Sequence, residues 1–339
     1  MKEAMLYQKL ADDRVKCHLC AHECTIADGR KGICQVRENR GGTLYTLVYG
    51  RTIARHVDPV EKKPLFHFHP GSKAYSIATP GCNFRCEWCQ NAEISQASEP
   101  DAVQTGMEAT PGEIVSAARQ NRCRSVAYTY TEPTIFFEYS YDTARLAHEE
   151  DLANVYVTNG FMTGEMLETI APYLDAANVD LKAFRDQTYR DYVGGRLEPV
   201  LNSLRAIKEL GIWLEVTTLV IPGLNDDPEE LRDAVRFIAD ELGPETPWHI
   251  SRFRPAYKMR DKSPTPISKL REAKQIGHDA GLHYIYLGNV PGESNTICHN
   301  CGETLIRRSG YRLVSNVLTA EGECPSCGTE VAGVGMVTS

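Results

Sequence analysis

The segment Gly81-Cys82-Asn83-Phe84-Arg85-Cys86-Glu87-Trp88-Cys89-Gln90-Asn91 places three cysteines in one short loop, with the spacing C-x3-C-x2-C. The residues just before it, 75–78, have the composition of a short buried strand, so the loop begins where a strand ends. A structural zinc would need a fourth ligand, whereas a 4Fe-4S cluster held by three thiolates keeps one iron open for another ligand. The pattern therefore favours a cluster that performs chemistry. A zinc site completed by a distant ligand is the alternative.

Strand-like and helix-like segments alternate around this loop. The expected strands are rich in β-branched or aromatic residues, as buried parallel strands are, and they span 75–78, 125–131, 154–159, 177–182, 213–221, 248–253 and 284–287. Helices between them have clear start signals, such as Asp227-Pro228-Glu229-Glu230 and Thr110-Pro111-Gly112-Glu113. These βα units predict an α/β fold with parallel strands, as an open sheet or a barrel, and a reactive site at the carboxyl ends of the strands.

Composition narrows the class of protein. The chain has 339 residues, with 37 Lys and Arg against 45 Asp and Glu, and so a net charge of −8. Nucleic acid is an unfavourable partner for such a chain, because phosphate contacts demand clustered cations. No apolar run reaches the roughly 18 residues of a membrane span, and the start lacks the basic-then-apolar pattern of a signal peptide. We expect a cytoplasmic protein without membrane contact.

The chain has 12 cysteines, and outside the loop most of them form two further groups. In a reducing compartment such spacings favour metal over disulfides. Near the C-terminus, two C-x2-C-G knuckles predict a structural zinc ribbon, with an auxiliary iron-sulfur cluster as the alternative; they contain Cys298, Cys301, Cys324 and Cys327. The N-terminal group fits zinc, which we favour, and also a second 4Fe-4S cluster; it contains Cys17, Cys20, Cys24 and Cys34. Cys123 stands alone and is expected to be a buried apolar residue.

These groups suggest four parts of the chain. Residues 1–50 form a cysteine-rich metal-binding module, 51–71 a connector, 72–292 the α/β domain and 293–339 a module like a zinc ribbon. Both cysteine-rich ends have too few apolar residues for a core of their own, so metal would supply the missing folding energy.

The three-cysteine loop resembles the signature of the radical S-adenosylmethionine superfamily, which has an aromatic residue, here Trp88, before the last cysteine. The resemblance continues at later strand ends: Tyr130-Thr131-Glu132-Pro133 is similar to the family's Gly-Gly-Glu-Pro motif, and Thr158-Asn159-Gly160 and Asp180-Leu181-Lys182 are similar to the enzymes that activate pyruvate formate-lyase. The segment Asp58-Pro59-Val60-Glu61-Lys62-Lys63-Pro64 is similar in sequence to the radical enzyme of the AmmeMemoRadiSam system. The resemblance implies a partial (β/α)6-type TIM barrel.

The resemblance also implies roles for residues. Cys82, Cys86 and Cys89 would hold the cluster, and S-adenosylmethionine would bind the open iron. An acceptor is needed near its ammonium group and a cation near its carboxylate, and Glu132 or Asp180 with Lys182 offers that pairing.

Two positions depart from the family. Thr131 stands where glycine is usual, so positive φ is harder to reach there. Val157 stands where the activating enzymes have an aspartate that contacts ribose, so Asn159 or another group would have to make that contact. His249 and Arg254 are further candidates for cofactor binding, although a histidine whose hydrogen bonds are satisfied within the fold is the commoner case.

The expected activity is reductive cleavage of S-adenosylmethionine to methionine and a 5'-deoxyadenosyl radical, which takes hydrogen from a substrate. A reduced ferredoxin or flavodoxin would donate the electron. By resemblance to the activating enzymes, the substrate could be a glycine of a partner protein; a small molecule, a peptide or RNA is the alternative. A non-catalytic zinc protein that binds nucleic acid is the alternative of another class.

Overall fold

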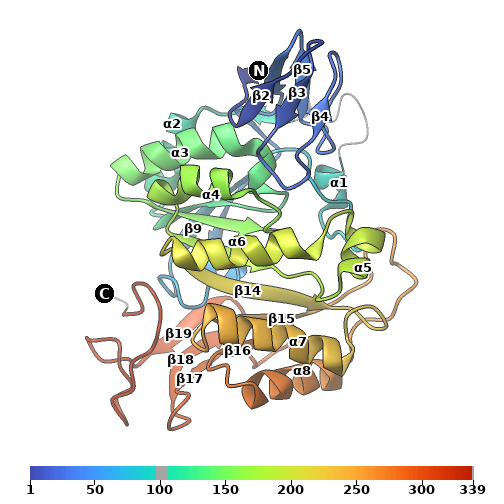
Figure 1. Ribbon diagram of the computed structural model, residues 1–339. Coiled ribbons are helices and arrows are strands. Elements are labelled where there is room, and N and C mark those ends of the chain that lie inside the picture. Colours follow the sequence, from blue (N-terminus) through green and yellow to red (C-terminus); the bar gives the residue numbers. More distant parts are fainter. Residues whose placement is uncertain (97–105, 338–339) are drawn as a thin grey trace.

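The structure, a computed structural model, describes residues 1–96 and 106–337 (Figure 1). Its central sheet has the strand order β16-β15-β14-β13-β12-β11-β9-β8. These strands are β8 (Ala54–Pro59), β9 (Lys73–Ala78), β11 (Ser125–Tyr128), β12 (Ala153–Thr158), β13 (Ala176–Asp180), β14 (Trp213–Val220), β15 (Trp248–Arg252) and β16 (Ile285–Gly288). From β9 to β16 neighbouring strands are parallel, and only β8 runs antiparallel.

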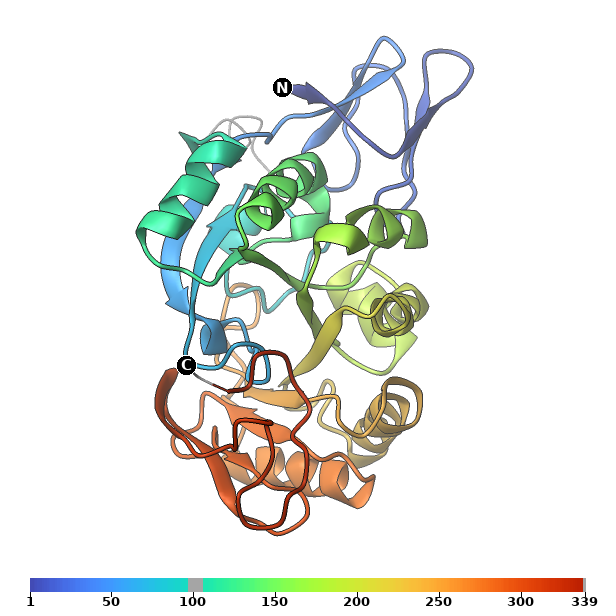
Figure 2. The ribbon, with the colours of Figure 1, turned by 90° about the vertical axis from the view of Figure 1, so that its left-hand side faces the viewer.

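Helices connect the parallel strands, and the longer ones lie on the outer side of the sheet (Figure 2). They are α1 (Ala92–Ser95), α2 (Pro111–Gln120), α3 (Phe137–Glu149), α4 (Gly164–Ile170), α5 (Asp186–Thr188), α6 (Leu197–Glu209), α7 (Pro228–Phe237) and α8 (Ile267–Asp279), with short helical turns at Val60–Lys62, Pro133–Phe136, Ala171–Tyr173, Tyr189–Val193 and Ile238–Leu242. The predicted caps are confirmed: the Asp227 side chain accepts from the first turn of α7, and Thr110 forms a capping box with Glu113. Because β8 and β16 do not pair with each other, the sheet stays open, and the partial barrel is confirmed.

Several expectations on boundaries are wrong. The fourth strand ends at Asp180 rather than at 182, so Lys182 lies beyond it. The second strand ends at Tyr128 rather than at 131, because the chain turns sharply at Tyr130. Residues 51–71 are more than a connector, since they contain β8, which pairs with β9 along its whole length. Lys63 and Glu61 in this segment are buried. Both are paired inside the fold, Lys63 with Asp58 and Glu61 with Arg308.

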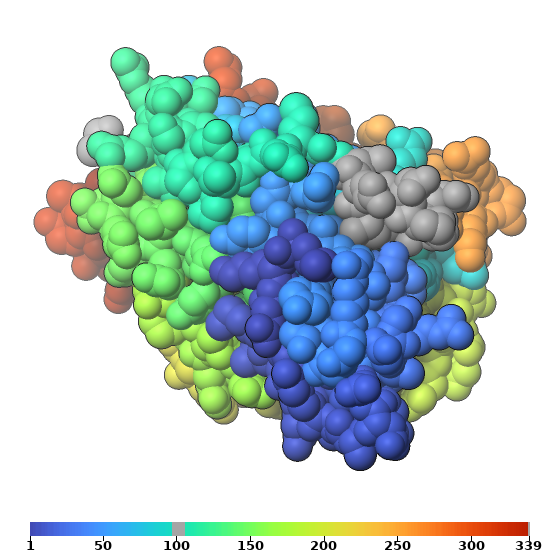
Figure 3. All heavy atoms as spheres, turned by 90° about the horizontal axis from the view of Figure 1, so that it is seen from above, coloured from blue at the N-terminus to red at the C-terminus, as the bar shows by residue number. Residues whose placement is uncertain are grey.

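The N-terminal module consists of two small sheets. The first has the order β1-β6-β5 and the second β2-β3-β4; the strands are β1 (Lys2–Glu3), β2 (Tyr7–Lys9), β3 (Val15–Cys17), β4 (Thr25–Ile26), β5 (Arg37–Arg40) and β6 (Thr43–Thr46), and β7 (Arg51–Thr52) pairs with β10 (Met107–Glu108) farther along. Its buried apolar residues belong to the same core as those of the barrel. Seen from above, the module lies directly on the body of the molecule (Figure 3).

The C-terminal module has a three-stranded sheet of β17 (Thr296–Ile297), β18 (Thr304–Ser309) and β19 (Arg312–Asn316). A small apolar cluster joins it to β16 through Tyr284 and Tyr286 and to Phe66. The buried Arg308 guanidinium donates to the Phe66 carbonyl at 2.7 Å. The module is therefore held to the amino end of the barrel by apolar and polar contacts.

Candidate active site

The loop with Cys82, Cys86 and Cys89 follows the carboxyl end of β9, where the sequence places it. Its backbone is fixed from two sides. The Arg85 N–H donates to the Val193 carbonyl at 2.7 Å, and the Arg85 guanidinium donates to the Cys82 carbonyl at 2.8 Å. The three thiols are thus held on a fixed loop, although they lie several residues apart.

The spacing and chemistry of these thiols fit a cluster better than a single ion. In the residues that the structure describes, one group of metal-ligating side chains has all its ligand atoms within 4.8 Å of one another, and it is the C-terminal quartet, not this loop. Burial, and then the charge of Glu132, raise the pKa of the Cys82 thiol. The Phe84 N–H lies 3.4 Å from Cys82 Sγ, as a donor to a cluster thiolate would.

Glu132 joins the ends of β11 and β12. Its carboxylate accepts from the Thr158 hydroxyl at 2.6 Å, the Asn159 N–H at 2.8 Å and the Thr134 hydroxyl at 2.6 Å. Burial raises the pKa of Glu132, and these donors partly oppose the rise. Since both oxygens already have protein partners, the carboxylate fixes the relative position of the strand ends; its contact with a methionyl ammonium stays a prediction.

The turn after β11 has its left-handed residue at Tyr130, with φ of 63°, and not at Thr131. Three interactions hold Tyr130 in this conformation. Its hydroxyl donates to Asp58, its ring lies 4.3 Å from the Lys63 ammonium, and its carbonyl accepts from the Asn91 side chain at 2.7 Å. The family motif is therefore shaped here without glycine.

Asp58 and Lys63 are supporting residues to which the sequence analysis gave no role. Lys63 is 1% exposed, and its Nζ lies 2.7 Å from the Asp58 carboxylate. Burial works against the charge on Asp58, but the hydrogen bonds from Lys63 and Tyr130 outweigh it and lower the pKa of Asp58. The two consecutive lysines after an aspartate and a proline were the available signal, but a charged segment more often lies in solvent.

Asp180 and Lys182 are brought together beside the cysteine loop. β13 ends at Asp180, so Lys182 lies two residues beyond the strand, and its Nζ is 2.8 Å from the Asp180 carboxylate. Burial disfavours the charged lysine, yet the charges of Asp180 and Cys86 outweigh this and raise the pKa of Lys182. Lys182 therefore lies within electrostatic range of Cys86. Contact with S-adenosylmethionine stays a prediction.

Asn159 and Trp88 have structural contacts in this region. Asn159 Nδ2 donates to the Asn83 side chain at 2.7 Å and lies 3.9 Å from Cys82 Sγ, while its Oδ1 accepts from the Phe161 N–H at 3.0 Å. A ribose hydroxyl would have to displace one of these partners. Trp88 is buried in the main core.

In the part of the chain that the structure describes, no hydrogen bond or ion pair joins His249 or Arg254 to the cysteine loop. His249 is buried and its Nε2 lies 2.6 Å from the Glu215 carboxylate, which also accepts from the Phe66 N–H at 3.0 Å. A buried carboxylate needs such a partner, which explains the histidine. Arg254 is exposed in the loop after β15.

A groove of about 780 Å³ opens beside Cys89. One wall is the chain from Cys89 into α1, and the other is the loop after β15, with Tyr257 and Arg260. Sequence analysis did not single out these two residues, because a lining role depends on the neighbouring loop. The groove gives access from the surface to the third cysteine.

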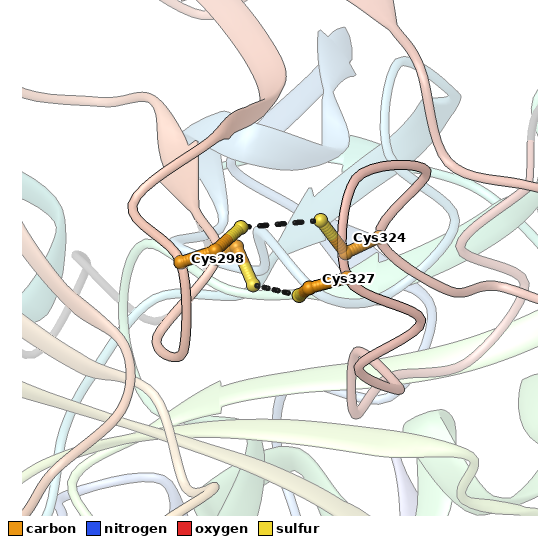
Figure 4. A group of neighbouring side chains, drawn as sticks. Cys298, Cys324 and Cys327 are labelled. Atoms are coloured by element: carbon orange, nitrogen blue, oxygen red, sulfur yellow. Dashed lines mark hydrogen bonds between the residues drawn. The ribbon is translucent and has the colours of Figure 1, made fainter.

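The C-terminal cysteines converge as two pairs (Figure 4). Sγ of Cys298 lies 3.6 Å from that of Cys327, and Sγ of Cys301 lies 3.6 Å from that of Cys324. A tetrahedral zinc with Zn–S of about 2.3 Å separates its sulfurs by about 3.8 Å. The quartet therefore fits one metal ion, and its assignment to zinc stays a prediction.

Cys123 is buried, as expected, and lies outside all three groups. Within 1–96 and 106–337, no helix is long and apolar enough to cross a membrane.

Comparisons with known proteins agree with this geometry. Residues 76–238 match the Radical SAM superfamily. An uncharacterized protein of Methanocaldococcus jannaschii is 45% identical over 334 residues, which is 98% of this chain and 99% of the relative. The pyruvate formate-lyase-activating enzyme of Clostridium pasteurianum is 24% identical over 197 residues, which is 53% of this chain and 80% of that enzyme. Among solved structures, SuiB of Streptococcus suis bound to S-adenosylmethionine has the same fold, with a TM-score of 0.51 and 14% identity over 68% of this chain and 53% of SuiB.

Proposed function

The chain belongs to the radical SAM superfamily, and from this premise we propose that it is an activating-enzyme-like member whose radical takes hydrogen from a glycine of a partner protein. Members of the superfamily are enzymes, so the alternative of a non-catalytic zinc protein is set aside. The observation that carries the proposal is the loop of three buried or half-buried thiols at the carboxyl end of β9, beside the Asp180–Lys182 pair.

In this proposal Cys82, Cys86 and Cys89 hold a 4Fe-4S cluster through three of its irons. When bound with S-adenosylmethionine, the cluster supplies one-electron cleavage of the sulfonium to methionine and a 5'-deoxyadenosyl radical. The protein contributes orientation and exclusion of water. The Arg85 guanidinium donates to the Cys82 carbonyl, and the Asn159 side chain donates to the Asn83 side chain. These contacts fix the loop, so the thiols keep their positions during turnover.

The Asp180–Lys182 pair would bind the amino-acid end of S-adenosylmethionine. A zwitterion needs an anion beside its ammonium and a cation beside its carboxylate, and here the two charges are 2.8 Å apart at the edge of the loop. Lys182 has only 16% of its side chain exposed, so its charge is poorly solvated and gains from a second carboxylate.

A macromolecular substrate is supported by the groove beside Cys89, which is wide and open to the surface. An extended peptide could lie between α1 and the loop after β15, with Arg260 available to a carbonyl or carboxylate. The relative from Clostridium pasteurianum is named for activation of pyruvate formate-lyase, which is a protein substrate. A reduced ferredoxin or flavodoxin would donate the electron, and a zinc-bound C-terminal module would add docking surface.

The activity is tested by anaerobic reconstitution with iron and sulfide, reduction with dithionite, and measurement of 5'-deoxyadenosine. Cys82→Ala, Cys86→Ala and Cys89→Ala should each abolish its release, and Cys123→Ala is the matched control because that thiol lies outside all cysteine groups. If the reconstituted wild-type protein releases none, or the three variants keep the activity, the proposal is wrong.

The substrate class has its own test. An anaerobic extract from cells grown with deuterated glycine is separated by size, and each fraction is incubated with the enzyme. Deuterium should enter 5'-deoxyadenosine from the protein fraction. Its appearance only with the small-molecule fraction would favour the alternative substrate class.

A further inference from the structure

The N-terminal cysteines lie in two loops of one small module. Cys17 ends β3, Cys20 and Cys24 lie between β3 and β4, and Cys34 precedes β5. The Cys17 N–H donates to the Cys24 carbonyl at 2.9 Å. A Cβ placed on Gly32, two residues before Cys34, would lie 3.8 Å from Cys24 Sγ, so the two cysteine-bearing loops are in contact.

Their spacing differs from that of the C-terminal quartet. A single tetrahedral ion draws four sulfurs to about 3.8 Å from one another, and in the described part of the chain the C-terminal quartet alone has its ligand atoms within 4.8 Å. Neither the N-terminal cysteines nor the three of the radical SAM loop reach that spacing. A four-iron cluster holds its thiolates farther apart, because iron and sulfide stand between them. Like the Cys82 loop, the N-terminal set therefore lacks the close spacing of the zinc-sized site.

Two histidines of this region each have one ring nitrogen in contact with another group. The His22 Nε2 lies 2.8 Å from the Asn83 carbonyl, and its ring packs on Phe161 at 4.8 Å. His18 Nδ1 faces the Glu23 carboxylate at 3.6 Å. The sequence itself supplies four thiols, which is the number that a 4Fe-4S cluster with four protein ligands needs.

A buried cation lies beside the N-terminal cysteines. The Arg37 side chain is 1% exposed, its Nη1 donates to Cys17 Sγ at 3.2 Å, and it pairs with Glu138. Its Nε is buried and has no hydrogen-bond partner among the described residues. Four thiolates around iron carry net negative charge, and a buried guanidinium with a free N–H is suited to it.

The module also touches the radical SAM loop at several points. His22 contacts the Asn83 carbonyl next to Cys82, and the Arg85 guanidinium donates to the Ile33 carbonyl next to Cys34. A Cβ placed on Gly81 would lie 3.3 Å from the Cys34 carbonyl. Covalent and hydrogen-bonded links thus connect Cys20 and Cys34 with Cys82 through very few residues.

We propose that Cys17, Cys20, Cys24 and Cys34 bind a second 4Fe-4S cluster, and that this cluster passes electrons to the one at Cys82. The sequence leaves zinc and a second cluster open for these four cysteines, and this proposal takes the cluster. A reduced ferredoxin or flavodoxin gives one electron to the N-terminal cluster, which is reduced and then reoxidised as the electron moves on; no bond of this cluster forms or breaks. The role as a relay rests on the proposed function, whereas the identity of the metal does not.

The metal is tested in a full-length variant with Cys82, Cys86 and Cys89 all changed to Ala, reconstituted anaerobically. It should keep about four irons and four sulfides per chain and give the electron paramagnetic resonance signal of a reduced cluster with dithionite. Adding Cys20→Ser and Cys34→Ser should remove both. Zinc in place of iron in the triple variant overturns the proposal. If the triple variant does not fold, Cys20→Ser in the otherwise native chain must lose about half of the iron, and undiminished iron overturns it.

The relay is tested by freeze-quench spectroscopy of the Cys82 cluster. With reduced flavodoxin, its reduction should be at least about 10-fold slower in Cys20→Ser than in the native protein, whereas dithionite, a small reductant, should reduce it at a similar rate in both. Equal rates with flavodoxin overturn the relay. Absence of S-adenosylmethionine cleavage would refute the proposed function and leave the iron analysis of the triple variant decisive for the cluster.

Discussion

Gly195 lies against the radical SAM loop, and its replacement by alanine tests whether packing there sets the cluster geometry. A Cβ at this position would lie 2.4 Å from Cε1 and 3.0 Å from Cζ of Phe84. The Phe84 ring cannot easily yield, because it is 1% exposed and packs at 5.0 Å from Phe161 and 6.2 Å from Tyr189. Overpacking of this kind costs about 1–3 kcal/mol, and the strain falls on the residue between Cys82 and Cys86.

We therefore expect Gly195→Ala to unfold at lower urea concentration by about 1–3 kcal/mol and to release 5'-deoxyadenosine up to about 100-fold more slowly, since a misplacement of about 1 Å has such an effect. Gly112→Ala is the matched control, because that glycine lies in the first turn of α2 with no atom near its Cβ position. A second variant, Gly195→Ala with Phe84→Leu, should recover part of the stability. Native stability and activity in Gly195→Ala would refute the reasoning.

Three further outcomes are expected. Lys182→Met and Asp180→Asn should each weaken S-adenosylmethionine binding about 10- to 100-fold, or about 1.4–2.8 kcal/mol, without loss of iron; unchanged affinity in anaerobic calorimetry would contradict this. Cys301→Ala should raise hydrogen exchange in residues 295–337 more than in the barrel, because metal supplies much of that module's folding energy, and equal exchange in both would argue against it. Burial lowers the pKa of His67 to about 4. The unfolded chain therefore takes up a proton first as pH falls from about 6.5 to about 4, and the free energy of unfolding should decrease by about 3 kcal/mol at most. Urea unfolding of His67→Gln should lack this dependence on pH.

Local patterns were sufficient to predict the seven parallel strands and the caps of α2 and α7, but not the antiparallel β8. Each rests on periodicity or on a cap and its first turn, which lie within a few residues. The segment 51–71 was misjudged because its burial is non-local: Asp58 and Lys63 pair under Tyr130, and Glu61 pairs with Arg308 from the far end of the chain. No pattern within the segment distinguishes these charges from solvated ones.

In the candidate site, too, features continuous in sequence could be predicted, whereas contacts between distant residues could not. The cysteine spacing predicted the position of the loop, and the resemblance to the activating enzymes singled out Asp180 and Lys182, because these motifs are continuous in sequence; their roles stay predictions. His249 was ambiguous since its partner Glu215 lies on the neighbouring strand, and its satisfaction could be seen only once β14 and β15 were side by side. The nature of the N-terminal metal was equally open, because C-x2-C-x3-C-x9-C fixes the number of ligands and leaves the distances among them to the folded loops.

The motif after β11 explains why a charged segment is buried there at all. A left-handed tyrosine costs about 1–2 kcal/mol relative to glycine, so Tyr130 needs compensation from its surroundings. A hydrogen bond to a charged group contributes about 1.5–3 kcal/mol, and a desolvated cation over a ring contributes up to about 2 kcal/mol. Asp58 and Lys63 supply these two interactions, and each also neutralises the other's buried charge. The segment before β9 and the motif after β11 therefore form one structural unit. Contacts from the charged residues of the segment stabilise a left-handed turn that a glycine would otherwise provide.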